Sequence, residues 1–145
     1  MDVRVLERAE VERVGAVLGL ARLYQGDGFY LVAWQDDEPL GHLHLALSDP
    51  PELQDVQVAT DHRRRGVANT LIAAAELEAR SRGFAALRVG VGVDNEPAQA
   101  LYRHCGFVDV GLDPVRVKGT IEIRTGPIEV DDILITWEKP LQPRT

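Results

Sequence analysis

The segment from residue 53 to residue 93 constrains the fold more than any other part of the chain. Residues 53–59, LQDVQVA, alternate apolar and polar side chains as a half-buried strand does, and residues 67–83 carry apolar side chains at helical spacing. Residues 86–93, ALRVGVGV, are almost entirely apolar, as in a strand covered on both faces. A strand, a helix and a second strand in this order predict a parallel pair joined by a right-handed crossover.

Further strands and helices flank this central unit. Alternating patterns predict strands at residues 3–7, 29–35, 40–47, 107–111, 115–123 and 132–138, and helices at residues 9–24 and 96–105. Strands that follow one another closely pair antiparallel, so the predicted fold class is α/β (α+β) with a mixed, mostly antiparallel sheet. Because no linker, repeat or low-complexity tract interrupts the pattern, we expect a single domain over residues 1–145.

Composition limits the classes of function. The 16 basic and 23 acidic side chains give a formal net charge of −7, which argues against general binding to nucleic acid or to an anionic membrane. Cys105 is the only cysteine, so neither an intramolecular disulfide nor a thiolate metal cluster can form, and we expect no bound metal. The longest apolar stretches have the length of a strand and the first ten residues carry charges, so we expect no membrane span, no export signal and a cytoplasmic location.

The turn before the central helix has the character of an anion site. It carries three consecutive arginines, Arg63, Arg64 and Arg65, followed by Gly66 and Ala68. The first turn of a helix presents unpaired backbone N–H groups and the positive end of the helix dipole, which both attract anions. Glycine and alanine are small enough to let a phosphate approach that backbone.

Two motifs in this region resemble those of a known family. Arg63-x-x-Gly66-x-Ala68, after the strand QDVQV, resembles the Gln/Arg-x-x-Gly-x-Gly/Ala pyrophosphate loop of the GNAT superfamily of acetyl-CoA-dependent N-acetyltransferases. Downstream, Asn95 and ALYRHCGF at residues 100–107 resemble the family's N-x-x-A-x-x-x-Y-x-x-x-G-F signature. The resemblance is detailed over residues 50–112, and outside them only the order of strands and helices agrees.

The resemblance implies a sheet of about seven strands in which the strands at 53–59 and 86–93 splay apart into a V, with helices on both faces. Acetyl-CoA, the co-substrate, would lie in this gap, its pantetheine arm on the backbone of the first strand and its pyrophosphate on the arginine turn. The residues implied to bind it are Val56, Gln57, Val58, Arg63, Arg64, Arg65, Gly66, Val67, Ala68, Asn69 and Asn95. Asn95 also suits the N-cap of the following helix, and both roles stay open.

Acetyl transfer to an amine needs a neutral nucleophile, a stabilised oxyanion and a proton for the departing thiolate. The resemblance implies that Tyr102 donates to the thiolate, since a phenol with a pKa near 10 can do so; a core aromatic is the alternative. A backbone N–H near Val58 is the natural donor to the oxyanion.

The general base is open among several residues. Glu52 lies fourteen residues before Gly66, where the histone-acetylating branch of the family has its base, although it could equally be an exposed loop carboxylate. Asp55 is the next choice. Gly90 occupies the position where the branch that modifies protein N-termini often has a glutamate, which counts against that branch's mechanism and substrate.

Two histidines alternate with leucines on one predicted strand. His42 and His44 therefore share a face and could meet a metal or a substrate. No third ligand stands at a diagnostic spacing, so the pattern favours a polar or solvent-facing pair on a hairpin. Cys105 is expected to be a small packing residue.

The sequence thus predicts an N-acetyltransferase that transfers an acetyl group from acetyl-CoA to a primary amine of a small molecule or peptide, by direct attack in a ternary complex. The alternative is an acyl-CoA-binding or regulatory module without turnover. The acidic surface favours a cationic amine acceptor. Relatives in the family commonly dimerise, so a homodimer is also an expectation.

Overall fold

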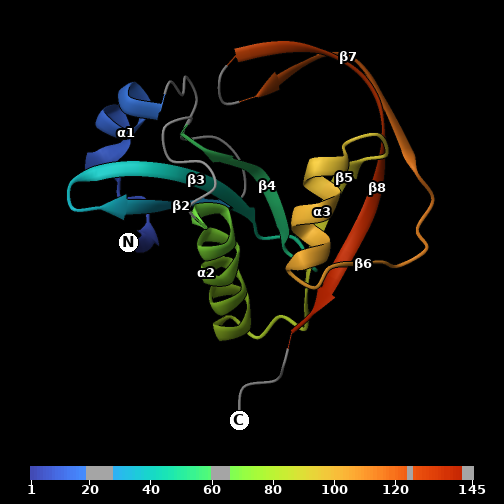
Figure 1. Cartoon of the computed structure of the whole chain (residues 1–145), viewed down its shortest axis with the longest axis horizontal. Helices are drawn as coiled ribbons and strands as arrows, with labels where there is room; N and C mark the ends of the chain where they lie inside the picture. Colours follow the sequence, from blue (N-terminus) through green and yellow to red (C-terminus); the bar gives the residue numbers. More distant parts are fainter. Residues whose placement is uncertain (19–27, 60–65, 124–125, 142–145) are drawn as a thin grey trace.

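The fold is a single eight-stranded sheet with helices on both faces (Figure 1), seen in a computed structural model that describes residues 1–18, 28–59, 66–123 and 126–141. The strands are β1 (Asp2–Val5), β2 (Gly28–Gln35), β3 (Glu38–Ala46), β4 (Glu52–Val58), β5 (Ala86–Gly92), β6 (Val108–Asp109), β7 (Val115–Ile123) and β8 (Gly126–Pro140). The helices are a 3-10 turn, η1 (Arg8–Glu10), and α1 (Val11–Leu18), α2 (Val67–Ser81) and α3 (Glu96–His104).

The strand order is β1-β2-β3-β4-β5-β8-β6, with β7 paired to β8. Among the described strands, β4 and β5 form the one parallel pair, and every other pairing is antiparallel. The parallel pairing covers only Glu52 with Arg88 and Leu53 with Val89, and beyond these residues the two strands separate. The predicted mixed, mostly antiparallel sheet with a central splay is confirmed.

Each face of the sheet has its own apolar core. On one face, α2 packs against β2 to β5, with Leu71, Ile72, Ala75 and Ala79 fully buried, as the helical spacing predicts. On the other face, Val14 of α1 packs with a cluster of side chains that includes Trp34 of β2. α1 therefore covers β2 and β3 opposite α2, which confirms helices on both faces.

Glycine and asparagine set the ends of the two helices that flank the splay. Gly83 follows α2 and Gly106 follows α3, each with a positive φ, 85° and 97°, that a side chain would disfavour. At the start of α3, the side chain of Asn95 accepts a hydrogen bond of 3.2 Å from the backbone N–H of Ala98. In the predicted helix at 9–24, residues 9–18 are helical as η1 and α1, and residues 19–24 lie outside the described ranges.

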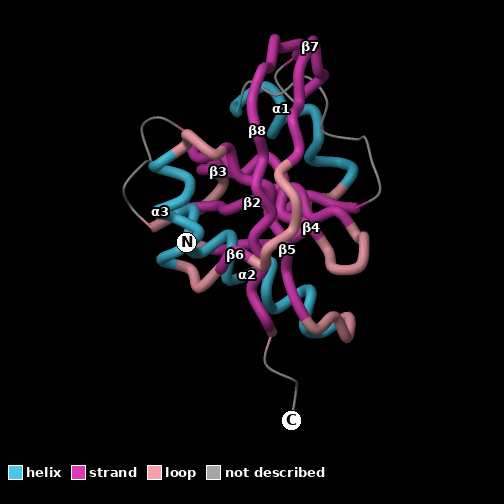
Figure 2. The backbone as a smooth tube through the Cα atoms, turned by 90° about the vertical axis from the view of Figure 1, so that its right-hand side faces the viewer, coloured by secondary structure: helices cyan, strands magenta, loops and turns pink. Residues whose placement is uncertain are grey.

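Strand β8 is long and joins two parts of the molecule. Its second half pairs with β5 and β6, while residues 126–134 pair with β7. Figure 2 shows β7 and the first half of β8 projecting together from the body of the sheet. None of the helices within the described ranges is both long and apolar enough to cross a membrane.

Candidate functional site

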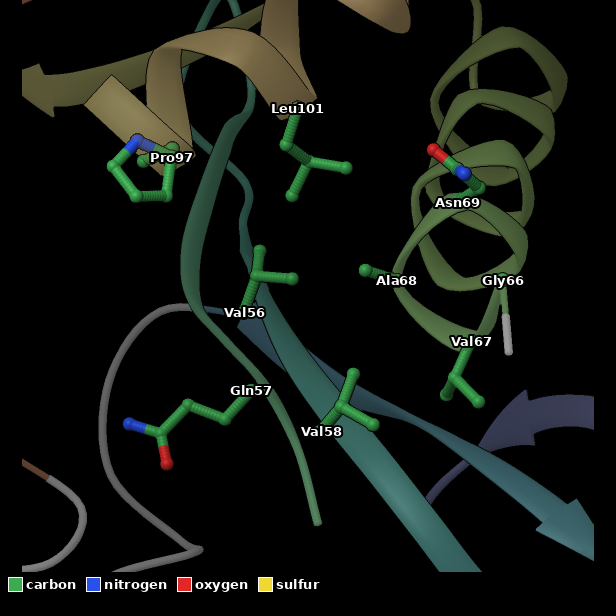
Figure 3. A pocket seen from close by; sticks show the side chains of 10 residues that line it. Val56, Gln57, Val58, Gly66, Val67, Ala68, Asn69, Pro97 and Leu101 are labelled. Carbon is green, nitrogen blue, oxygen red and sulfur yellow. The ribbon is translucent and has the colours of Figure 1, made fainter. Parts of the chain in front are cut away.

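The splay between β4 and β5 opens beside a cavity of about 570 Å³. Its walls come from β4, from the first turn of α2 and from α3 (Figure 3). The lining residues are Val56, Gln57, Val58, Gly66, Val67, Ala68, Asn69, Pro97, Ala98 and Leu101. The cavity thus has an apolar middle and, at one end, the N-terminus of a helix.

The N-terminus of α2 keeps its backbone donors available. Gly66 is the N-cap and has a left-handed backbone with φ 77°, and no described side chain caps the helix. The first helical hydrogen bond runs from the N–H of Thr70 to the carbonyl of Gly66, and the N–H groups before it have no partner within the helix. A Cβ on Gly66 would meet nothing within 4 Å, so it is the left-handed backbone that favours glycine at this position.

The structure brings together most of the residues predicted to bind the cofactor. Seven of them line the cavity: Val56, Gln57, Val58, Gly66, Val67, Ala68 and Asn69. Figure 3 shows the side chains of Val56 and Val58 directed toward α2, whereas Gln57 points the other way. Arg63, Arg64 and Arg65 lie outside the described residues.

The wall of the cavity opposite α2 comes from α3, the helix that begins after Asn95. Asn95 does not line the cavity and instead caps α3. Sequence reasoning missed Pro97, Ala98 and Leu101, which form that wall. The signal was available, because all three lie between Asn95 and Tyr102 within the second motif.

A polar contact ties the two helices together at the rim of the cavity. The Sγ of Cys105, after the last turn of α3, donates a hydrogen bond of 3.2 Å to the side-chain oxygen of Asn69 on α2. Burial, with the charge of Glu76 as a second cause, raises the pKa of the Cys105 thiol, which therefore stays protonated and able to donate. Cys105 is half-buried against the main core, so the predicted packing role is confirmed with a hydrogen bond added.

Tyr102 lies in the core behind the α3 wall. Its side chain is only 8% exposed, and its ring meets that of Phe107 edge-on with a centroid distance of 5.7 Å. Burial, helped by Cys105, raises the pKa of Tyr102 to about 12, so the hydroxyl stays protonated at neutral pH and can donate a hydrogen bond. Its neighbour Leu101 lines the cavity, but Tyr102 itself does not.

Carboxylates and glycines gather on the opposite face of the splay. A Cβ on Gly90 would lie 3.7 Å from a carboxylate oxygen of Glu52, and a Cβ on Gly92 would lie 2.5 Å from one of Asp132. The missing side chain of Gly90 therefore leaves room beside the carboxylate of Glu52 on β4, whereas at Gly92 the carboxylate of Asp132 on β8 already occupies the place of a side chain. The half-buried position of Glu52 differs from that of an exposed loop carboxylate.

Asp55 has an unusual backbone and an unusual environment. Its φ is 53°, in the left-handed region, at an irregularity where β4 shifts its register against β3 between His42 and His44. One carboxylate oxygen accepts a hydrogen bond of 2.8 Å from the Gln57 side chain, while the other is buried and has no partner among the described residues. Burial raises the pKa of Asp55, against the opposing effects of Gln57 and His44.

The prediction of a solvent-facing histidine pair is wrong. His42 and His44 are each 1% exposed, because β3 lies between β2 and β4 and the Tyr30 ring covers them, with centroid distances of 6.2 and 4.8 Å. The Nδ1 of His44 lies 3.0 Å from the side-chain oxygen of Gln54 and donates to it. Neither ring nitrogen of His42 has a partner among the described residues, and burial lowers the pKa of His42 to about 4.

A comparison with family models places the chain in one family. The model described as "Acetyltransferase (GNAT) family" matches residues 6–107. A streptothricin acetyltransferase of Escherichia coli is 35% identical over 83 residues, which cover 56% of this chain and 48% of that protein. An uncharacterised N-acetyltransferase of Bacillus subtilis, YsnE, is 32% identical over 107 residues, which cover 67% of this chain and 71% of that protein. The chain spans less than half the length of the streptothricin acetyltransferases it matches.

Solved structures share the fold. A nourseothricin acetyltransferase aligns over 97% of this chain and 98% of its own, with a TM-score of 0.72 and 24% identity. A Bacillus subtilis acetyltransferase solved with CoA aligns over 97% and 98%, with a TM-score of 0.73 and 20% identity. At these identities the likeness extends to the arrangement of the sheet and helices.

Proposed function

Because the chain belongs to the GNAT family of acetyltransferases, we propose that it transfers an acetyl group from acetyl-CoA to a primary amine of a small molecule or peptide. The observation that carries this proposal is the cavity at the splay, where an extended strand and the N-terminus of α2 meet in one site. An elongated ligand with amide groups at one end and a pyrophosphate further along fits such a site.

In this proposal acetyl-CoA runs along β4 toward α2. The backbone from Val56 to Val58 pairs with the pantetheine amides, because the parallel pairing of β4 with β5 ends at Leu53. The N–H groups of Val67, Ala68 and Asn69 face the pyrophosphate, with Arg63, Arg64 and Arg65 contributing positive charge. Asn95 holds the start of α3 against the other side of the ligand.

The chemistry needs few protein groups. A backbone N–H of β4 near Val58 stabilises the negative charge on the carbonyl oxygen as the amine attacks. Tyr102, protonated at neutral pH, donates a hydrogen bond toward the departing sulfur. A carboxylate on the opposite face of the sheet, Glu52 or Asp55, receives the proton of the incoming ammonium.

The acceptor proposed here is a cationic amine. It would approach over Gly90, where the side chain is missing and the carboxylate of Glu52 borders the space, with the carboxylate of Asp132 nearby at Gly92. Negative charge at this position favours an ammonium group and disfavours an acid. Since two of the relatives are streptothricin acetyltransferases, streptothricin belongs among the first acceptors to assay, beside polyamines and peptides with basic residues.

Three further points belong to the same proposal. We take residues 1–145 as one catalytic domain, located in the cytoplasm and assembled as a homodimer. Size-exclusion chromatography with light scattering tests the dimer directly.

The direct test is release of free CoA. Purified protein, acetyl-CoA and a panel of amines are followed by a thiol reagent, and mass spectrometry identifies the acetylated amine. Turnover with at least one amine, forming equal amounts of CoA and amide, is the expected result. Tight CoA binding without turnover on any acceptor would instead support the acyl-CoA-binding module.

A further inference from the structure

We infer that Asp55 is the catalytic residue that removes the proton from the acceptor ammonium, an assignment that rests on the proposed acetyl transfer. Asp55 has three relevant features: its position in β4, the face of the sheet that it occupies, and a carboxylate oxygen without a hydrogen-bond donor among the described residues.

Asp55 lies where the gap between the strands begins. The last parallel pair is Leu53 with Val89, and Asp55 is two residues further along β4. Glu52, the other candidate, lies before that point, at the position that pairs with Arg88. A group that reacts with an amine inside the gap is better placed just beyond the last pair than within the paired segment.

The register shift at Asp55 determines on which face of the sheet the following side chains of β4 lie. Leu53 points into the core beneath α2, and Val56 and Val58 line the cavity on that same side. Gln54 contacts His44 on the other face, and the Gln57 side chain, which donates to Asp55, points away from α2 (Figure 3). Asp55 is therefore on the acceptor side of the sheet with Gln54 and Gln57, while Val56 and Val58 contact the cofactor side.

The carboxylate of Asp55 is incompletely satisfied. One oxygen accepts from Gln57, and the second is buried without a donor among the described residues. A buried hydrogen-bond acceptor without a donor lowers the stability of the fold by about 1–3 kcal/mol, so its presence in a folded protein calls for a functional explanation. In the acceptor complex an ammonium N–H supplies this donor, after the groups that now cover the oxygen have moved aside.

The groups around Asp55 set how readily it takes a proton. On β4 this group is Gln57, and on β3 it is His44, whose ring is covered by the Tyr30 ring of β2. Burial is the largest influence and raises the pKa of Asp55, which makes the carboxylate a stronger base than an exposed aspartate.

The proposed step balances in atoms and charge. The carboxylate of Asp55 takes one proton from R–NH3⁺, which gives R–NH2 and the neutral acid. The amine nitrogen then forms the C–N bond to the acetyl carbonyl carbon as the C–S bond breaks, and the thiolate takes up the second nitrogen proton. Asp55 returns its proton to solvent, so R–NH3⁺ and acetyl-CoA give the amide, CoA–SH and one H⁺.

Asp55→Asn is the decisive variant. Asparagine tolerates a left-handed φ as aspartate does, and its amide still accepts from Gln57, so the local backbone is kept. A matched control exists, because Asp36 in the turn between β2 and β3 is the other non-glycine residue of positive φ in the described part of the chain, at 54°. Asp36→Asn makes the same chemical change at an exposed position away from the splay.

The measurement is kcat/KM from pH 6 to 9 for wild type, Asp55→Asn, Asp36→Asn and Glu52→Gln, together with CoA affinity by calorimetry. Asp55→Asn should lose at least about a hundredfold in kcat/KM with CoA affinity unchanged, and Asp36→Asn should behave as wild type. Glu52→Gln should lose less than about tenfold, as expected for a group that binds the ammonium without taking its proton. A second acceptor whose amine is already neutral at the assay pH should regain most of the rate with Asp55→Asn.

The outcomes separate this inference from the proposed function. Turnover by Asp55→Asn within about threefold of wild type, or a hundredfold loss confined to Glu52→Gln, would overturn the assignment and leave the acetyl transfer in place. Absence of turnover by wild type with every amine would overturn the proposed function and this assignment together. Failure of the neutral amine to rescue Asp55→Asn would show that the carboxylate does something other than deprotonation.

Discussion

Leu53 of β4 lies opposite Val89 of β5, and the two parallel strands separate immediately beyond this pair. Both side chains are buried in the core beneath α2, so the point of separation is held by packing on that face. On the same face β4 continues with Val56 and Val58 into the cavity wall. The pair therefore marks the place where the hydrophobic core ends and the proposed reaction site begins.

Ala68 should control access to the cofactor side. Its methyl group points into the cavity (Figure 3), and Ala68→Leu places a branched side chain there. We expect CoA affinity to fall at least about tenfold, equivalent to about 1.4 kcal/mol. Ala73→Leu, on the exposed side of the same helix, is the control and should bind CoA normally. Equal CoA affinity in the two variants would contradict the assignment of the cavity.

The arginine turn should contribute positive charge to CoA binding. Arg64→Glu and Arg65→Glu should each weaken CoA binding at least about tenfold, and should reduce its sensitivity to salt, because each removes a charge-assisted contact with phosphate. Arg82→Glu, at the other end of α2, makes the same change of charge and should have a small effect. Titration calorimetry at two salt concentrations measures both quantities, and unchanged affinity would remove the phosphate role.

Tyr102→Phe should slow the chemical step and leave binding intact. The ring still packs on Phe107, so the free energy of unfolding should change by no more than about 1 kcal/mol. Loss of the hydroxyl should lower kcat about a hundredfold with CoA affinity unchanged. Because burial raises the pKa of Tyr102 to about 12, its ionisation should not appear in a rate profile below pH 10. An unchanged kcat would show that Tyr102 is a packing residue only.

His42 should make stability depend on pH. Its pKa is lowered by burial from 6.5 to about 4, so the unfolded chain binds the proton more tightly than the folded chain. Stability is therefore full above about pH 6.5 and falls as the pH drops toward 4. Between pH 7.5 and 4.5 the expected loss from this residue is about 2.5 kcal/mol. Urea unfolding of wild type and His42→Leu at both pH values measures it, and an equal loss in the two proteins would contradict the prediction.

The sequence alone predicts those parts of the fold and of the site that depend on residues close together along the chain. A strand, a helix N-terminus and a second strand follow one another within 53–93, and the residues of Gly66 to Asn69 reach the cavity as predicted. The glycines that end α2 and α3 do so at positive φ, which is a property of single residues. These features need no knowledge of distant parts of the chain.

What could not be predicted depends on contacts between distant segments. The alternation of His42 and His44 predicts that they share a face. Their burial follows from β2 and β4 on either side of β3 and from the Tyr30 ring, which the pattern of β3 does not contain. The irregularity at Asp55 interrupts the alternation of side chains between the two faces of β4. The alternating apolar and polar residues of the sequence do not reveal this interruption.

The pairing of β5 has a consequence for the order of folding. β5 shares only two residue pairs with β4, and most of its hydrogen bonds depend on β8, where Arg88 and Glu138, 50 residues apart along the chain, form an ion pair. On a ribosome, β1 to β4 and α2 can assemble from neighbouring segments well before β8 has been synthesised. Contacts between residues that are far apart along the chain form slowly during folding. α3, which forms one wall of the cavity and packs on β5, should therefore be the last part of the site to become native, and ligand binding should begin only when the C-terminal strand has docked.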